Sequence, residues 1–151
     1  MTKGKNGSAL LSWAVAIFAS LCGASAFFLI FAPAVLYEPP LWGRETYSGL
    51  QVAFGYAASG IRVFRGSAGV ALAFIFPLAA ASCAVIGKGN KIVAIVSAAL
   101  FVAGGVLAFC LPNLLVGAYV GTPALGVGGA LCGVLSVAGG VTECASLLLK
   151  E

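Results

Sequence analysis

The chain has 151 residues, of which 62% are hydrophobic and 8% are charged, and its net charge is +4. A soluble domain carries about 25% charged residues because it needs a polar surface toward water. This composition excludes a water-soluble globule, and it predicts that lipid is the main solvent of the chain.

The charged residues stand at the ends of three uncharged stretches, 6–37, 66–87 and 92–142. A membrane-crossing helix needs about 20 apolar residues, so each of the first two stretches supplies one helix. The third stretch would extend roughly 75 Å as a single helix, and the prolines at 112 and 123 mark turns near its middle. The sequence therefore predicts an all-α membrane protein, a bundle of four transmembrane helices.

The first helix is predicted over residues 9–35. Its start also fits a secretory signal peptide, with Lys3 and Lys5 ahead of an apolar run and Ala24-Ser25-Ala26 as a cleavage motif. The apolar run continues unbroken through residues 27–31, which favours a retained helix.

Residues 36–65 form an outer loop, because Glu38-Pro39-Pro40 ends the helix. Alternation of larger apolar residues over 50–54 indicates a short strand, and residues 61–65 are typical of an interfacial turn. A two-stranded ribbon and a helix lying in the interface both suit this loop, so the choice between them stays open.

The second helix is predicted over residues 66–87 and contains Pro77. Proline removes one backbone hydrogen bond, so we expect a kink and a hinge at this position. An inner turn at 88–91, a third helix at 92–111, an outer loop at 112–123 and a fourth helix at 124–149 complete a single integral membrane domain.

The bias of lysine and arginine across short loops sets the orientation of a membrane protein. One side of the predicted bundle holds Lys3, Lys5, Lys88, Lys91 and Lys150, and the other holds Arg44, Arg62 and Arg65. Glu38 and Glu45 offset the arginines. We therefore expect an integral protein of the plasma membrane with both termini in the cytoplasm.

The sequence has few of the residues and motifs that enzymes use for catalysis. The chain has no histidine, which excludes Ser-His-Asp and Cys-His nucleophiles and every His-containing metal site. It also has no Walker or dinucleotide-binding loop. We expect no enzymatic activity, no cofactor and no metal.

Two further classes are disfavoured. The basic residues stand at segment ends and do not gather on one face, so no nucleic-acid partner is predicted. All five cysteines lie in apolar runs, where cysteine usually packs as a small hydrophobic residue and forms no disulfide framework.

Glu143 is the single carboxylate expected at membrane depth. Such a residue is energetically costly and indicates a functional site by default, here a coupling carboxylate. It lies about 10 Å from the helix end at Lys150, so an interfacial ion pair with Lys88, Lys91 or Lys150 is the competing interpretation.

Small residues recur at helical spacing in the first and fourth helices. In lipid, helices associate where small side chains let their backbones approach closely. The pattern predicts either packing within one bundle or a contact face between subunits. The residues are Ala16, Ser20, Ala24, Gly126, Gly129, Gly133, Ser136 and Gly140.

Arg62 and Arg65 stand three residues apart just before the second helix. They are suited to contact a lipid phosphate or the carboxylate of a partner, and they also fit an ordinary anchor at a helix end. Trp42 is a third predicted contact in the same loop.

The layout is similar to that of two tetraspan groups. Claudin-type proteins have a large first extracellular loop with a Trp motif and two cysteines; Trp42 is present here and the loop cysteines are absent. The small multidrug transporters carry their coupling carboxylate in the first helix, whereas Glu143 is in the fourth. We assign the chain to neither group.

The sequence thus predicts a small non-enzymatic membrane subunit or scaffold that forms a homo-oligomer or joins a larger membrane complex. Its contacts with lipids, other helices and partners would come from the small-residue faces and the loop at 36–65. The alternative is a small transporter or channel, with Glu143 as the titrating group and Pro77 as a hinge.

Overall fold

A computed structural model describes residues 3–38, 43–58, 61–87, 90–115 and 122–148. Four of its helices are long and apolar enough to cross a membrane, which confirms the predicted set of four apolar helices. They are α1 (Lys3–Phe28), α3 (Ala68–Ile86), α4 (Lys91–Phe109) and α5 (Val127–Leu148).

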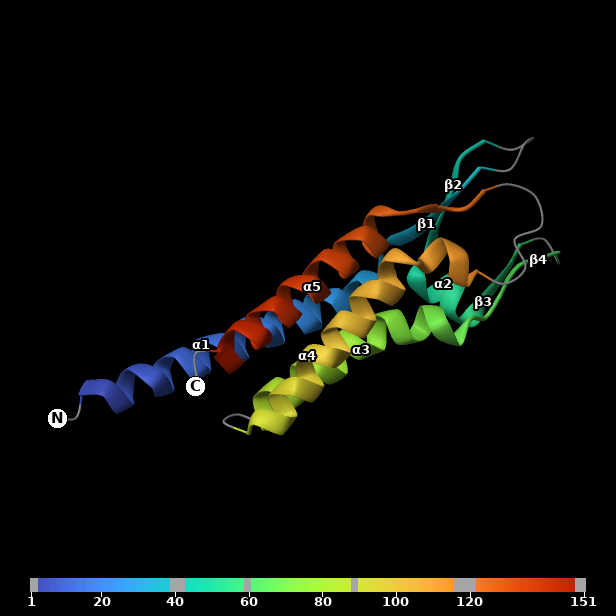
Figure 1. Cartoon of the computed structure of the whole chain (residues 1–151). Coiled ribbons are helices and arrows are strands. Elements are labelled where there is room, and N and C mark those ends of the chain that lie inside the picture. The colour runs from blue at the N-terminus through green and yellow to red at the C-terminus, as the bar shows by residue number, and fades with distance from the viewer. Residues whose placement is uncertain (1–2, 39–42, 59–60, 88–89, 116–121, 149–151) are drawn as a thin grey trace.

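The four helices form a ring. α1 and α4 each pack against both α3 and α5, and each helix runs antiparallel to its two neighbours. The strands and the short helix α2 gather at the end of the bundle where α1 and α4 finish (Figure 1). We call this end the cap, meaning the described residues of 33–65 and 111–125.

The helices bury mostly small side chains, with Phe74 and Phe101 as large exceptions, and expose many large ones. Buried positions on the helices include Ala19, Ala73, Ala80, Ser97, Ala108 and Ser136, whereas Ile17, Leu21, Ile75, Val106, Val134 and Val141 are exposed. A bundle that folds in water buries its large apolar side chains, because their removal from water drives its folding. The opposite distribution seen here is typical of helices that associate in lipid.

The predicted small-residue stripe of α5 lies inside this bundle. A Cβ atom on Gly133 would come within 2.8 Å of the Phe109 ring, and one on Gly129 within 2.7 Å of the Leu111 side chain. Gly140 and Ser136 are buried on the same face, and Gly126 lies against the backbone of residues 33 and 34. The stripe therefore packs against other parts of the same chain.

The small residues of α1 are placed differently. Ala16 is buried, while Ser20 and Ala24 are half-buried beside α3. The tightest approach of α1 to α3 is instead at Gly23, where a Cβ atom would fall 2.3 Å from the carbonyl oxygen of Pro77. Only glycine permits this separation of the two backbones.

Pro77 is buried within α3 and lies between two neighbouring helices. Its carbonyl faces Gly23 of α1, and its ring carbons lie within 2.9 Å of the Cβ position of Gly104 on α4. Proline has no N–H, so the carbonyl of Ala73, four residues earlier, lacks its usual donor. The buried thiol of Cys132 on α5 donates to that oxygen, with a sulfur–oxygen distance of 3.7 Å. The hinge at Pro77 stays a prediction.

The cap is built on a three-stranded antiparallel sheet in the order β2-β1-β5, with β1 (Pro33–Tyr37), β2 (Glu45–Ser48) and β5 (Ala124–Leu125). β1 follows α1, and β5 precedes α5. The sheet therefore joins the segment between α1 and α3 to the segment between α4 and α5. The Gly126 N–H donates to the carbonyl of Ala34 at 2.8 Å, and the Ser67 hydroxyl donates to the carbonyl of Leu114 at 2.9 Å.

Both helices next to this sheet are shorter than predicted. α1 ends at Phe28 and passes through the 3-10 turn η1 (Leu29–Phe31), and the expected helix over 9–35 is wrong at this end. Pro33 explains the difference, because it holds Ala32 in an extended conformation. The fourth helix begins at Val127, since residues 124–125 belong to β5.

The expected strand over 50–54 is wrong, because these residues form α2 (Gly49–Phe54). Ser48 caps this helix by accepting from the Gln51 N–H, and the Gln51 side chain accepts from the Ser48 N–H. This reciprocal capping box satisfies two backbone donors at the start of the helix. The capping box thus favours a helix at residues 49–54 more strongly than the weak alternation of apolar residues favours a strand.

The expected interfacial turn at 61–65 is also wrong. These residues are β4 (Ile61–Arg65), which pairs antiparallel with β3 (Gly55–Ala58). The loop therefore contains the two-stranded ribbon and also a short helix, and a position of that helix in the membrane interface stays a prediction. The second loop contributes a 3-10 turn, η2 (Leu111–Leu114), and β5.

One hydrophobic cluster runs from the bundle into the cap. Its buried members come from α1, β1, β2, α2, β4, α3, α4, η2 and α5, and they include Ala26, Val35, Tyr47, Val52, Phe64, Phe74, Leu111 and Cys132. The cap therefore shares a core with the helices.

We predict that Cys132→Ala lowers the unfolding free energy by about 1 kcal/mol, because the Ala73 carbonyl loses its donor. In a Pro77→Ala background the residue 77 N–H restores the helical bond, so the same substitution should have little effect. Reversible unfolding in mixed micelles measures all four corners of this double-mutant cycle. Cys132→Ser is the matched control, since it keeps a donor. If Cys132→Ala had the same effect with Pro77 and with Ala at position 77, this would contradict the hydrogen bond from Cys132 to the Ala73 carbonyl.

Candidate functional site

The candidate site lies on the β3–β4 hairpin of the cap. Gly55 is paired with Arg65 and Ala57 with Arg62, with an irregularity between Tyr56 and Ala57. Residues directly opposite one another share a face of a hairpin, and so do residues two apart on one strand. Arg62 and Arg65 therefore lie on the same face. In a regular strand, residues three apart would lie on opposite faces, so the bulge is what brings them together.

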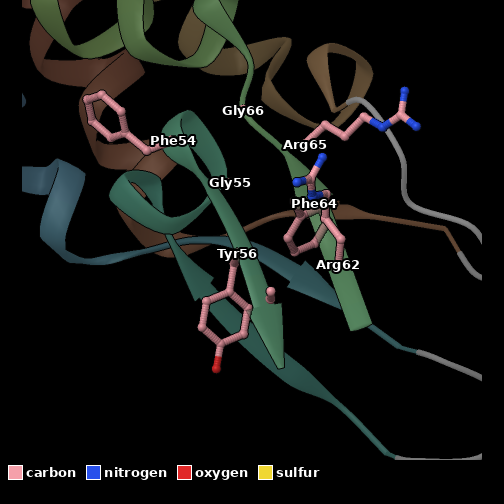
Figure 2. A pocket seen from close by; sticks show the side chains of 8 residues that line it. Phe54, Gly55, Tyr56, Arg62, Phe64, Arg65 and Gly66 are labelled. Carbon is pink, nitrogen blue, oxygen red and sulfur yellow. The ribbon is translucent and has the colours of Figure 1, made fainter. Parts of the chain in front are cut away.

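This face carries a groove of about 420 Å³. It is hollow because Gly55 and Ala57, opposite the arginines, have little or no side chain. In Figure 2 both guanidinium groups lie toward the helix end of the hairpin, and the Tyr56 hydroxyl points away from them. The groove is lined by Phe54, Gly55, Tyr56, Ala57, Arg62, Phe64, Arg65 and Gly66.

Two glycines hold the base of the hairpin close to α2. Gly55 has φ +92°, which L side chains rarely adopt, so α2 can pass directly into β3. A Cβ atom on Gly66 would come within 3.0 Å of the Ala53 carbonyl oxygen. Phe54, the last residue of α2, is thereby held at the groove with 74% of its surface exposed.

The back of the hairpin is supported by aromatic side chains. Phe64 is only 1% exposed, and its ring makes edge-on contacts with Tyr47 and Tyr37 at centroid distances of 4.8 and 6.2 Å. Tyr56 packs on Tyr47 at 5.7 Å. Such packing fixes the backbone of β4 and hence the positions from which the two arginines extend.

The described carboxylates do not pair with the two arginines. Glu38 forms an ion pair with Arg44 at 2.7 Å, and Glu45 accepts from the Tyr47 hydroxyl. Glu143 lies in α5, and Glu151 lies outside the described residues. Within the described part of the chain, neither Arg62 nor Arg65 has an ion pair or hydrogen bond.

The other predicted residues do not join this groove. Glu143 is 4% exposed and faces the interior of the bundle from α5. Lys91, one predicted ion-pair partner, is the exposed first residue of α4, whereas Lys88 and Lys150 lie outside the described residues. The predicted contact at Trp42 also falls outside them.

Sequence reasoning identified the two arginines and missed Phe54 and Tyr56 as their neighbours. A signal for part of this arrangement was present, because Ser48 followed by Gln51 is a capping box that begins a helix and Gly55 fits its end. The bulge has no comparable signal, so the shared face of the arginines required the structure.

Family models, curated proteins and solved structures give no match to this chain. The two arginines of the groove nevertheless favour a particular class of ligand, which is an anion. Guanidinium groups bind carboxylates and phosphates with two parallel hydrogen bonds, whereas the exposed ring of Phe54 points away from both of them (Figure 2).

We predict that Tyr47 ionises above the ordinary range of tyrosine. Burial raises the pKa of Tyr47, and the hydrogen bond and negative charge of Glu45 raise it further. Because the folded state holds this proton more tightly than the unfolded state, the associated stability is present below about pH 10 and is lost as the pH rises above it.

Alkaline titration of tyrosinate absorbance in detergent checks this expectation. Tyr47→Phe should remove the latest component, and Tyr56→Phe, the matched control, should leave it in place. If every tyrosine of the wild-type protein ionised in the ordinary range, this would contradict the burial of Tyr47 and its hydrogen bond to Glu45.

Proposed function

We propose that this chain is a four-span integral membrane protein that acts by association, as an accessory subunit or scaffold, and not by catalysis. Its side-chain distribution supports membrane insertion, since all four long helices turn large apolar residues outward. The spans of 19–22 residues extend about 28–33 Å, which matches a hydrocarbon core of about 30 Å.

The charges at the two ends of the bundle support an orientation. By sequence, the segment ends opposite the cap hold five lysines and the cap holds three arginines. The side with more lysine and arginine in its short loops stays in the cytoplasm. We therefore place both termini in the cytoplasm and the cap outside the cell, at the plasma membrane.

The cap is the proposed association surface. It shares a core with the helices, so it presents a fixed shape. Among the described residues, β2 is paired with β1 alone, so the other side of its backbone has no strand partner there and could take a strand of a partner. This fixed surface with an open strand edge is the observation that carries the proposal.

The helix faces limit where partners can bind. The small-residue stripe of α5 is filled by Phe109, Leu111 and β1 of the same chain, so a second helix cannot occupy it without displacing them. A second copy or a larger complex would therefore contact the cap or the outward helix faces.

Transport is the alternative, and the burial of Glu143 favours it. A buried carboxylate on the interior face of a membrane helix can take up and release a proton or cation during transport. Loss of pH-gradient-driven flux in proteoliposomes on Glu143→Gln would replace the association proposal by this one.

We predict that the protein, extracted together with its native lipid, has a mass greater than that of one 15.0-kDa chain. A photoreactive amino acid at the exposed Thr46 of β2 should crosslink to the protein neighbour in intact cells. The same amino acid at Val134, which faces outward from α5, is the matched control and should label lipid. A lone chain by mass, with no protein adduct from Thr46, would contradict association through the cap.

A further inference from the structure

The arginine groove lies where a lipid headgroup would be found if the chain is inserted as proposed above. Arg65 is three residues before the first residue of α3, and Arg62 is three residues farther along β4. At about 3.3 Å per strand residue, Arg62 is at most about 10 Å beyond Arg65. The polar zone on each side of a bilayer is roughly 5–8 Å thick, which reaches this depth when long arginine side chains extend along it.

The groove suits an anionic headgroup. Two guanidinium groups stand on one face with no carboxylate among the lining residues. Both guanidinium groups lie toward the helix end of the hairpin (Figure 2), which is the side of the membrane in the proposed placement.

The described carboxylates do not supply a counter-charge to the two arginines. Of the acidic residues near the cap, Glu38 is bonded to Arg44 and Glu45 accepts from Tyr47. Two arginines held on one face without an anion repel one another, and a phosphate that accepts hydrogen bonds from both removes that repulsion.

We propose that this groove binds the phosphate of an anionic phospholipid from the surrounding leaflet. Arg62 and Arg65 hold the phosphate. This inference rests on the proposed membrane placement and is independent of whether the cap binds a protein partner.

Native mass spectrometry of the full chain in detergent tests the proposal, with dioleoylphosphatidylglycerol and dioleoylphosphatidylcholine titrated in parallel. We expect a preference for phosphatidylglycerol that falls about 30-fold in the double variant Arg62→Gln/Arg65→Gln, because each basic residue near an anionic surface contributes about 1 kcal/mol.

Arg44→Gln is the matched control, because Arg44 is an exposed cap arginine that already has a partner in Glu38. It should keep the wild-type preference. Both groove arginines are exposed, so the double variant should retain the wild-type helix content and unfolding temperature. Arg62→Lys/Arg65→Lys should recover part of the preference, since lysine keeps the charge and loses the two-pronged geometry.

Several outcomes would overturn the lipid site. They are an unchanged lipid preference in the double variant, an equal loss in Arg44→Gln, displacement of the lipid by glycerol 3-phosphate at equimolar concentration, and binding of hexaglutamate through the same arginines without any lipid preference. Failure of membrane insertion itself is distinguishable, because the chain would then stay soluble without detergent.

Discussion

In the proposed membrane placement, the structure depends on how closely the helix backbones approach one another in a solvent of hydrocarbon. In lipid there is no hydrophobic driving force that buries large apolar side chains. Helix contacts must therefore come from van der Waals packing and interhelical hydrogen bonds. The interior follows this constraint: Gly23, Pro77 and Gly104 bring α1, α3 and α4 together at one level. Where a phenyl ring enters the interior, a glycine faces it, as Gly139 faces Phe101.

The same constraint explains the polar groups of the interior. A proline in α3 leaves the Ala73 carbonyl without its helical donor, and Cys132 supplies one from α5. Ser97 bonds the Ala80 carbonyl from α4 at 2.9 Å. In hydrocarbon an unsatisfied polar group is costly, so these contacts both satisfy the backbone and fix which helices are neighbours.

At the end of the bundle, the cap likewise satisfies polar backbone groups. Its connections pair with one another as strands, and β1 lies between β2 and β5. Because the cluster of buried residues is continuous from α1 to β4, the groove that carries Arg62 and Arg65 is positioned by the helices below it. The bundle thus presents a polar surface that is fixed by a shared core, as the proposed role in association requires.

The sequence was sufficient for the four apolar helices, because charge clustering and span length report directly on hydrocarbon thickness. It also pointed to Arg62 and Arg65. It was insufficient for the cap, where the capping box at Ser48 outweighs the alternation of residues 50–54 and a single bulge decides which face Arg62 takes. It also left open which faces the small residues cover, since spacing alone cannot distinguish contacts within a chain from contacts between chains.

The most direct measurement uses the unmodified protein in bilayers that contain a lipid with a photoreactive group at the end of one acyl chain. Labelled residues are then mapped by mass spectrometry. The account predicts labels on outward positions of several helices, such as Ile75, Val106 and Val134, and none on Glu45 or Thr46 of the cap. Labels confined to the cap, or found on the interior stripe at Gly133 and Ser136, would contradict the arrangement of small residues inside and large residues toward lipid.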